Sequence, residues 1–209
     1  MSLFLLFAAA YLLGSIPTAL WVSKLFFGID IREHGSKNMG ASNTFRVLGP
    51  GWGIVVLVVD IAKAAAAVQL ARFIEPQQWL GAETSLWQLL LGLMAVVGHI
   101  FPVFAGFRGG KGVACLFGAV LAIQPWTALL SVVAFLLVVL LTRYVSLGSV
   151  AGAVVLAACV VFAVKEQNPY FRWFAAGGAI VITVMHIPNI KRLLKGTENK
   201  INLRRKRNR

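Results

Sequence analysis

Residues 85–123 read SLWQLLLGLMAVVGHIFPVFAGFRGGKGVACLFGAVLAI. Two apolar runs, 85–106 and 113–123, flank a short loop that holds the only Lys and Arg residues of the stretch, Arg108 and Lys111. The first run is about as long as the ~20 residues that a helix needs to cross a bilayer. The stretch therefore predicts membrane helices joined by a cationic, glycine-rich loop.

The same apolar character extends along the whole chain. Its 209 residues are 59% hydrophobic with a mean hydropathy of +0.81, which excludes an ordinary soluble domain. We predict an all-α, polytopic membrane protein with seven transmembrane helices, forming a single integral membrane domain over residues 1–209. The apolar segments are 3–27, 51–74, 85–106, 113–123, 126–142, 147–164 and 170–186. The first lacks a basic leader and a small-residue cleavage site, so we expect a membrane helix rather than a signal peptide.

The distribution of Lys and Arg predicts the orientation. With the N-terminus outside, sixteen of the 20 Lys and Arg residues lie on the cytoplasmic side, three lie outside and Lys63 lies within a helix. Positive residues concentrate in cytoplasmic loops, so we expect the N-terminus outside and the C-terminus in the cytoplasm. The basic tail around Arg204–Arg207 is then expected to lie on anionic lipid rather than on nucleic acid.

The glycine-rich loop, Gly106–Gly112, is the first candidate for a ligand site. It holds four glycines and two cations in seven residues. Glycines let backbone N–H groups approach a ligand closely, and Arg108 and Lys111 add charged donors. This chemistry suits a phosphate held at a membrane surface. The alternative is a plain basic turn between two helices.

The first cytoplasmic loop, residues 32–46, is dense in short hydrogen-bonding side chains, glycine and cations. Hydroxyl and amide groups can bind phosphate oxygens or sugar-like hydroxyls, and cations can neutralise a phosphate. The alternative is an ordinary solvated loop. The candidate residues here are Ser36, Lys37, Asn38, Asn43 and Arg46.

Five further polar residues lie in or beside apolar segments. His99 is a candidate for substrate contact or proton handling, although a lone histidine there is also typical of a hydrogen-bonded core residue. His186 and Asn189 begin a third polar segment at the cytoplasmic interface, for which a basic helix end is an equal alternative. Asp60 and Lys63, three residues apart on one helix face, are either functional or a neutralising pair.

Several chemistries lack their sequence signature. Lys111 is followed by Gly112 rather than Ser or Thr, so the loop is not a nucleotide-binding P-loop. No acidic cluster offers a magnesium site, and Cys115 and Cys159 show no metal-ligand spacing. No histidine begins the H-x-x-x-x-D pair of the common acyl-CoA-type acyltransferases. We therefore expect no metal and no cofactor.

Taken in order, these segments resemble the bacterial acyl-phosphate-dependent glycerol-3-phosphate acyltransferases, the PlsY family, over nearly the whole chain. Two positions depart from the family's usual pattern: Cys115 stands where the family often has Thr, and Met185 where it often has Arg. The resemblance rests on Gly14–Pro17, Gly35–Asn43, Gly98–Gly112, Ser146–Ser149, His186–Asn189 and Gly196–Glu198.

The resemblance implies transfer of a fatty acyl group from acyl phosphate to the 1-hydroxyl of glycerol 3-phosphate. The products would be lysophosphatidic acid and phosphate, in the first step of phospholipid synthesis at the cytoplasmic face of a bacterial inner membrane. The expected partners are the two substrates and membrane lipid. The oligomeric state is left open, and a monomer suffices.

The resemblance also suggests roles for the candidate residues. Those expected to bind acyl phosphate are Ser36, Gly109, Gly110, Lys111 and Gly112. Those expected to bind glycerol 3-phosphate are Lys37, Asn38, Asn43, Arg46, His186 and Asn189. The catalytic residues are expected to be Ser36, Arg46, His99 and Lys111.

Two routes are open for the proton of the attacking hydroxyl. His99 could take it as a general base, or an oxygen of the acyl phosphate could take it. We favour the second route, because the family resemblance implies no dedicated base and no carboxylate stands near His99 in the sequence.

The competing interpretation is a membrane transporter of a phosphorylated solute. A transporter usually binds its solute near the bilayer midplane, between repeated halves. In this sequence the polar residues gather at one face, and no repeat is evident.

Overall fold

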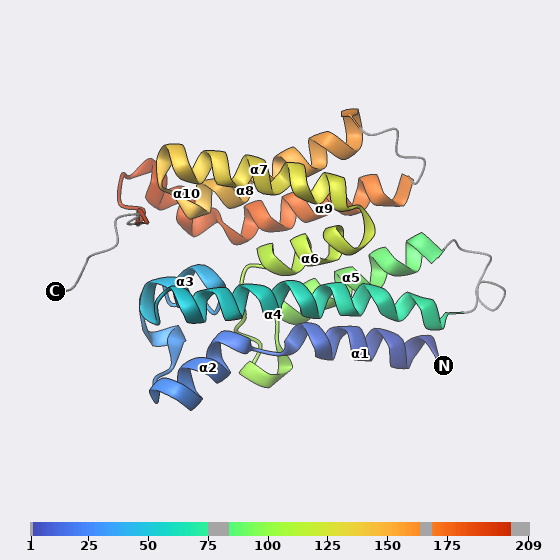
Figure 1. Cartoon of the computed structure of the whole chain (residues 1–209), viewed down its shortest axis with the longest axis horizontal. Helices are drawn as coiled ribbons and strands as arrows, with labels where there is room; N and C mark the ends of the chain where they lie inside the picture. Colours follow the sequence, from blue (N-terminus) through green and yellow to red (C-terminus); the bar gives the residue numbers. More distant parts are fainter. Residues whose placement is uncertain (1, 75–83, 164–168, 202–209) are drawn as a thin grey trace.

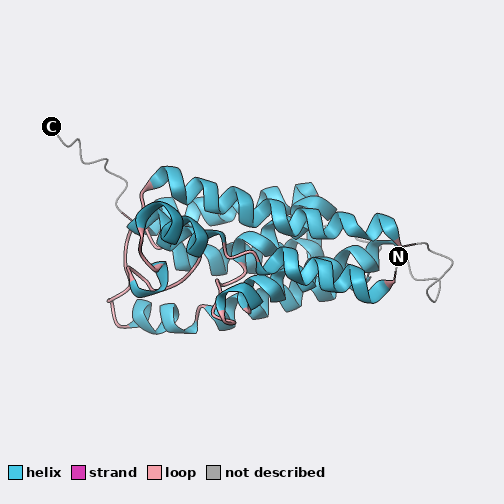
Figure 2. Cartoon of the chain, turned by 90° about the horizontal axis from the view of Figure 1, so that it is seen from below, coloured by secondary structure: helices cyan, strands magenta, loops and turns pink. Residues whose placement is uncertain are grey.

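The structure, a computed structural model, describes residues 2–74, 84–163 and 169–201. The described residues form helices and loops without a strand (Figure 2), which confirms the predicted all-α class. The helices are α1 (Leu3–Ser15), α2 (Thr18–Phe27), η1 (Ile31–Glu33), α3 (Ala41–Val47), α4 (Pro50–Gln69), η2 (Leu70–Phe73), α5 (Thr84–Ile100), η4 (Val103–Ala105), α6 (Val113–Ile123), α7 (Pro125–Thr142), α8 (Val145–Ala158), the π-helical η5 (Cys159–Ala163), α9 (Pro169–Met185) and α10 (Ile187–Leu194).

Four to six membrane spans are supported by helix length and composition in the described residues. The four continuous spans are Pro50–Phe73, Thr84–Ala105, Pro125–Thr142 and Val145–Phe162. Two helix pairs, α1 with α2 and α9 with α10, pass the same test together but bend by 43° and 57°. The predicted short fourth segment is α6, an apolar helix of 11 residues.

The first apolar segment differs from the single helix predicted over 3–27. Helix α1 ends at Ser15, and α2 begins at Thr18 after Pro17. Proline lacks the N–H needed to continue an α-helical ladder, and its ring clashes with the preceding turn. The bend therefore follows from Pro17, which the apolar pattern alone does not reveal.

Glycines bring the helices of the core into close contact. A Cβ added at Gly14 of α1 would overlap the backbone of Ala95 in α5, and one at Gly98 would overlap the Tyr11 carbonyl. A Cβ at Gly118 of α6 would overlap the backbone of Ile61 in α4. Small residues at such crossings are typical of membrane helix packing. Backbone contact at these crossings fixes the positions of α5 and α6, which flank the glycine-rich loop.

The two ends of the bundle differ in composition. Figure 1 places the start of α1 at one end, and α2, η1, α3 and α10 at the other. We call this second end the polar end. It carries the loop between α2 and α3 and the segment that follows α10. Helix α6 is shorter than its neighbours and begins part-way along the bundle, with its N-terminus toward the polar end (Figure 1). Two of the polar segments predicted to share one face, the α2–α3 loop and the segment around α10, share this end, and the glycine-rich loop leads into α6 from the same side (Figure 1).

Candidate active site

The loop between α2 and α3 is folded around the side chain of Asn43, which is 1% exposed. Its Oδ1 accepts a hydrogen bond from the N–H of Ser36 at 2.7 Å, and its Nδ2 donates to the carbonyls of Ile31 and His34 at 3.2 and 3.0 Å. Gly35 has a φ of +60°, and a Cβ there would overlap Asn43 Oδ1. Both ends of the Asn43 amide are thus engaged by the loop backbone, so this predicted ligand braces Ser36.

The other candidates predicted within residues 32–46 are more accessible, although the structure places Arg46, like Asn43, on helix α3. Ser36, Lys37 and Arg46 are exposed, and Asn38 accepts a hydrogen bond from the N–H of Gly40 at 2.9 Å. Lys37 has a φ of +59°, a left-handed conformation that costs a non-glycine residue about 1–2 kcal/mol. Among the described residues, no hydrogen bond or ion pair joins Ser36, Lys37 or Arg46 to the glycine-rich loop.

An arginine that the sequence analysis did not single out ties the first loop to the segment before the glycine-rich loop. Arg32 donates from Nη1 to the carbonyl of Ala105 at 2.9 Å. Its Nε and Nη2 bind the two carboxylate oxygens of Asp30 at 2.9 and 2.7 Å. These hydrogen bonds from Arg32 hold the pKa of Asp30 well below its usual range. The Asp-x-Arg spacing beside a short helix is the signal that could have indicated this clamp.

At each of the four glycines of the loop, the backbone conformation or a close contact disfavours a side chain. Gly106 and Gly112 have φ values of +62° and +83°, a region that favours glycine. A Cβ at Gly109 would overlap the carbonyl of His99, and one at Gly110 would overlap its Nε2. The N–H of Gly110 donates to the His99 carbonyl at 3.0 Å, so it is already engaged. The glycine content therefore fits the loop tightly over His99, which lies beneath it.

The uncapped N-terminus of α6 follows directly from this loop. Gly112 occupies the N-cap position, and no side chain caps the helix. The first N–H group to bond within the helix is that of Leu116, which donates to the carbonyl of Gly112 at 2.7 Å. The N–H groups of Val113, Ala114 and Cys115 therefore have no intrahelical partner. An uncapped helix N-terminus with a lysine immediately before it is suited to bind an anion.

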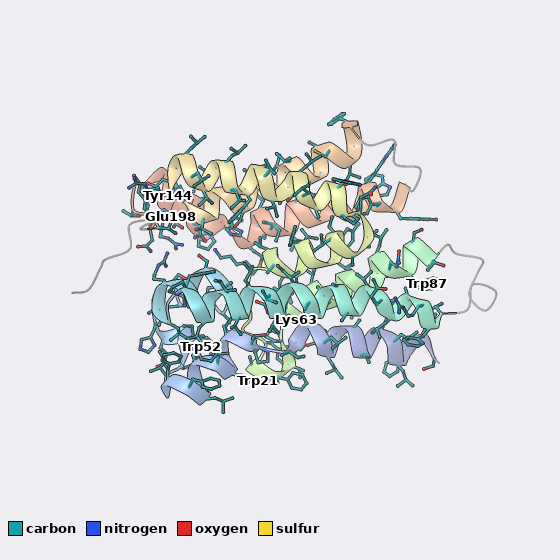
Figure 3. All side chains as sticks on the ribbon, viewed as in Figure 1. Trp21, Trp52, Lys63, Trp87, Tyr144 and Glu198 are labelled. Carbon is teal, nitrogen blue, oxygen red and sulfur yellow. The ribbon has the colours of Figure 1, made fainter. Side chains whose placement is uncertain are left out.

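Lys111 joins the glycine-rich loop to the third polar segment. Its Nζ donates to Oδ1 of Asn189, whose Nδ2 donates to Oε1 of Glu198 at 2.6 Å. Arg192 and Ser146 also donate to this carboxylate, at 2.6 and 2.8 Å. Figure 3 shows Glu198 at the polar end, beside Tyr144. The structure thus brings two predicted residues, Lys111 and Asn189, into direct contact.

Glu198 belongs to the segment Gly196–Glu198 that supports the family resemblance, but it was not predicted as a site residue. Burial acts to raise the pKa of Glu198, yet hydrogen bonds from Asn189, Arg192 and Ser146 prevail and lower it. The carboxylate is therefore ionised and orients Asn189. Burial also lowers the pKa of Lys111 to about 8. The lysine remains charged at neutral pH, but its charge is easily lost at alkaline pH.

His186 lies at the bend between α9 and α10 and is 3% exposed. Its Nδ1 lies 2.8 Å from the carbonyl of Ile182, an acceptor. In neutral imidazole Nδ1 must then carry the proton, which leaves Nε2 as an acceptor. Such an acceptor could bind a substrate hydroxyl.

His99 has a carboxylate neighbour that is distant in the sequence. Its Nδ1 lies 3.6 Å from Oδ1 of Asp60, and Lys63 Nζ lies 2.8 Å from the same oxygen. Asp60, His99 and Cys115 form a group whose possible metal-ligand atoms all lie within 4.8 Å of one another. However, Cys115 Sγ donates to the Asp60 carbonyl at 3.2 Å, and the Lys63 ammonium already neutralises the carboxylate. The group therefore fits an ion-pair cluster better than a metal centre.

Comparison with known proteins decides the family. A profile of the glycerol-3-phosphate acyltransferase family matches residues 4–196. The chain belongs to this family. The glycerol-3-phosphate acyltransferase of Synechocystis sp. is 44% identical over 195 residues, covering 91% of this chain and 87% of the relative. That of Listeria monocytogenes serovar 1/2a is 42% identical over 200 residues, covering 96% and 97%.

Solved structures agree with this membership of the glycerol-3-phosphate acyltransferase family. The crystal structure of PlsY (YgiH), an integral membrane glycerol 3-phosphate acyltransferase, matches in its glycerol 3-phosphate form with a TM-score of 0.85 and 36% identity, over 95% of both chains. Its lysophosphatidic acid form matches with a TM-score of 0.81 over the same shares. The predicted family and enzyme class are confirmed, and the transporter interpretation is not favoured.

Proposed function

We propose that this glycerol-3-phosphate acyltransferase uses acyl phosphate as its donor and transfers the acyl group to the 1-hydroxyl of glycerol 3-phosphate. The products are lysophosphatidic acid and inorganic phosphate. The observation that carries the proposal is the contact between Lys111 and Asn189 beside the uncapped N-terminus of α6. This junction offers cationic and neutral donors from two chain segments to two phosphorylated substrates.

The donor phosphate is assigned to the loop and the start of α6. Lys111 supplies the positive charge, and the free N–H groups of the first α6 turn supply directed donors. The Gly110 N–H is excluded from this set because it bonds to His99. Gly109, Gly110 and Gly112 instead allow the backbone to lie close to the phosphate, and Ser36 approaches it from the first loop.

Glycerol 3-phosphate is assigned to the side of Lys111 that Asn189 occupies. Asn189 and His186 are held by Glu198 and by the Ile182 carbonyl, so their remaining polar atoms have fixed directions. Lys37 on the first loop and Arg46 on α3 are exposed cations that can neutralise its phosphate. Asn38 and Asn43 contribute by shaping that loop.

The reaction needs no covalent enzyme intermediate. The 1-hydroxyl oxygen attacks the acyl carbonyl, the bond from the carbonyl carbon to the phosphate oxygen breaks, and an ester forms. The hydroxyl proton passes to the leaving phosphate. His99 lies beneath the loop and is 6% exposed, which favours this substrate-assisted route over a histidine base. Positioning of two bound substrates can lower a barrier by about 7–11 kcal/mol.

We further propose a single seven-span domain in a bacterial inner membrane, with the polar end in the cytoplasm. The support is the concentration of Lys and Arg in the segments of this end. We expect a reporter fused to the C-terminus to be active in the cytoplasm and one fused to the N-terminus to be external. Cleavage of a C-terminal tag by protease added to intact cells would contradict the orientation.

The donor is tested with purified protein and labelled glycerol 3-phosphate. Palmitoyl phosphate, palmitoyl-CoA and palmitoyl carrier protein are supplied in separate reactions. We expect labelled lysophosphatidic acid mainly from palmitoyl phosphate, without added Mg²⁺, because neutral donors and Lys111 bind both phosphates. Equal or greater turnover with palmitoyl-CoA would overturn the donor assignment, as would inhibition by a chelator that Mg²⁺ reverses.

The lowered pKa of Lys111 predicts an alkaline limit to activity. The ammonium is charged below its pKa of about 8 and loses its proton as the pH rises through that value. Since kcat/KM reports the free enzyme, kcat/KM for acyl phosphate should be constant near pH 7 and fall about tenfold per pH unit above about 8. A profile that stays level to pH 9.5 would show that the Lys111 charge is not required.

A further inference from the structure

We propose that Asp60 and Lys63 are positioning residues for the glycine-rich loop. The pair fixes His99 beneath Gly110 and connects it to the break between α1 and α2. The proposal rests on the proposed function in one respect, namely that this loop belongs to the acyl-phosphate site.

Lys63 binds the break between α1 and α2. Because Pro17 cannot continue the helix, the backbone around Ile16 lacks ordinary helical hydrogen bonding. Lys63 Nζ donates to the Ile16 carbonyl at 2.8 Å. A free carbonyl in a membrane-spanning segment is costly, so this bond stabilises the bend and anchors Lys63.

The imidazole of His99 lies between Asp60 and Gly110. Lys63 and His99 share the same oxygen of Asp60, at 2.8 and 3.6 Å. The Nε2 side of the ring lies against Gly110, where a Cβ would overlap it. The His99 carbonyl accepts the Gly110 N–H at 3.0 Å. His99 therefore supports Gly110 from its ring and from its backbone, and Asp60 holds the ring in place.

The helix break, the Asp60–Lys63 pair and His99 meet at one small cavity. It is lined by the break between α1 and α2, by Asp60 and Lys63 of α4, by His99 and Pro102, by Met39 of the first loop and by Gly110. Figure 3 shows Lys63 well inside the bundle, away from Glu198 at the polar end and from Trp87 at the other. The cluster thus lies beneath the site, where its members act on the loop rather than on free substrate.

The energetics favour a positioning role over a stabilising one. Asp60 and Lys63 are 2% and 5% exposed, and a buried ion pair is often no more stabilising than apolar residues of similar volume. Removing one partner leaves an uncompensated charge, whereas removing both does not. A double substitution can therefore separate stability from loop geometry.

The experiment compares Asp60→Asn, Lys63→Met and the double variant Asp60→Asn/Lys63→Met with the wild type. Thr127→Val is the control: Thr127 is 1% exposed on α7, and its hydroxyl has no hydrogen-bond partner among the described residues. Hydrogen–deuterium exchange is measured for peptides covering residues 106–112 and 187–194. Thermal stability and the KM values for palmitoyl phosphate and glycerol 3-phosphate are measured in parallel.

We expect both single variants to lose thermal stability. The double variant should regain the part of the loss that comes from an uncompensated buried charge, but it should stay below the wild type because the Ile16 carbonyl loses its donor. In the double variant, exchange over 106–112 should still be about tenfold faster, with 187–194 unchanged. Its KM for palmitoyl phosphate should rise about tenfold, while kcat and the KM for glycerol 3-phosphate change less than about threefold. The control should match the wild type throughout.

Three outcomes would overturn the positioning role. They are wild-type exchange and KM in the double variant, faster exchange in both peptides alike, and failure of the double variant to fold. If the wild type makes no lysophosphatidic acid from palmitoyl phosphate, the proposed donor is wrong, yet the exchange data still decide whether the pair positions the loop.

Discussion

Replacing Lys111 by alanine is expected to reduce kcat/KM for palmitoyl phosphate by about 10²–10⁴-fold. The Lys111 side chain is the charged group at the N-terminus of α6, and it also contacts Asn189 on the acceptor side. Loss of a charged donor from a buried anion site typically costs about 3–5 kcal/mol. Each 1.36 kcal/mol corresponds to about a tenfold change in rate.

The same substitution should leave the fold intact. Lys111 Nζ donates to a neutral amide oxygen of Asn189, so its removal leaves no bare charge behind. We expect a melting temperature within a few degrees of the wild type. Lys195→Ala, on the exposed residue that follows α10, is the matched control and should keep full activity. The Lys111→Arg variant should also have low activity, because the planar guanidinium group does not replace a compact ammonium group in a tight loop.

Much of the helical framework was predictable from the sequence because each span carries its own signal. Apolar runs of sufficient length predicted the membrane helices, and the glycine-rich loop marked the start of α6. The bends at Pro17 and His186 were harder to predict from the sequence, because a proline or histidine near the membrane interface is equally compatible with the end of a helix. Six spans at most are supported by helix length in the described residues, with α6 as the short seventh segment.

The candidate site was predictable as a set of segments but not as a set of contacts. The sequence indicated Lys111 and Asn189 separately, and only folding brings them together. Likewise, no carboxylate stands near His99 in the sequence, yet Asp60 approaches its ring from α4. Such long-range pairings depend on helix packing, which local pattern does not determine.

Individual roles were the least predictable part of the site. Asn43 and Ser36 have similar polarity and are close in the sequence, but Asn43 is buried on α3 and Ser36 is exposed in the loop before it. Residue type and spacing do not distinguish a side chain that binds a ligand from one that braces the loop around it. Arg32 shows the converse, because it was only one of several loop cations until its bond to the Ala105 carbonyl was known.

Gly110→Ala is expected to have the second large effect. The added methyl group would overlap His99 Nε2, and the ring cannot move freely because Asp60 lies on its other nitrogen. Overpacking of a tight core costs about 1–3 kcal/mol. The loop should therefore shift away from His99 and displace Lys111 from its contact with Asn189.

For Gly110→Ala we expect kcat/KM for palmitoyl phosphate to fall about 100-fold, which corresponds to roughly 3 kcal/mol. Most of the loss should lie in the KM for palmitoyl phosphate, because the displaced loop belongs to the donor site. Gly51→Ala in α4 is the control, since a Cβ there meets no atom within 4 Å. Unchanged donor KM in Gly110→Ala would show that the loop geometry does not determine donor binding. If adding His99→Ala to Gly110→Ala restored activity, the clash with the imidazole would be identified as the cause, because the three heavy atoms nearest to the new methyl group all belong to that ring.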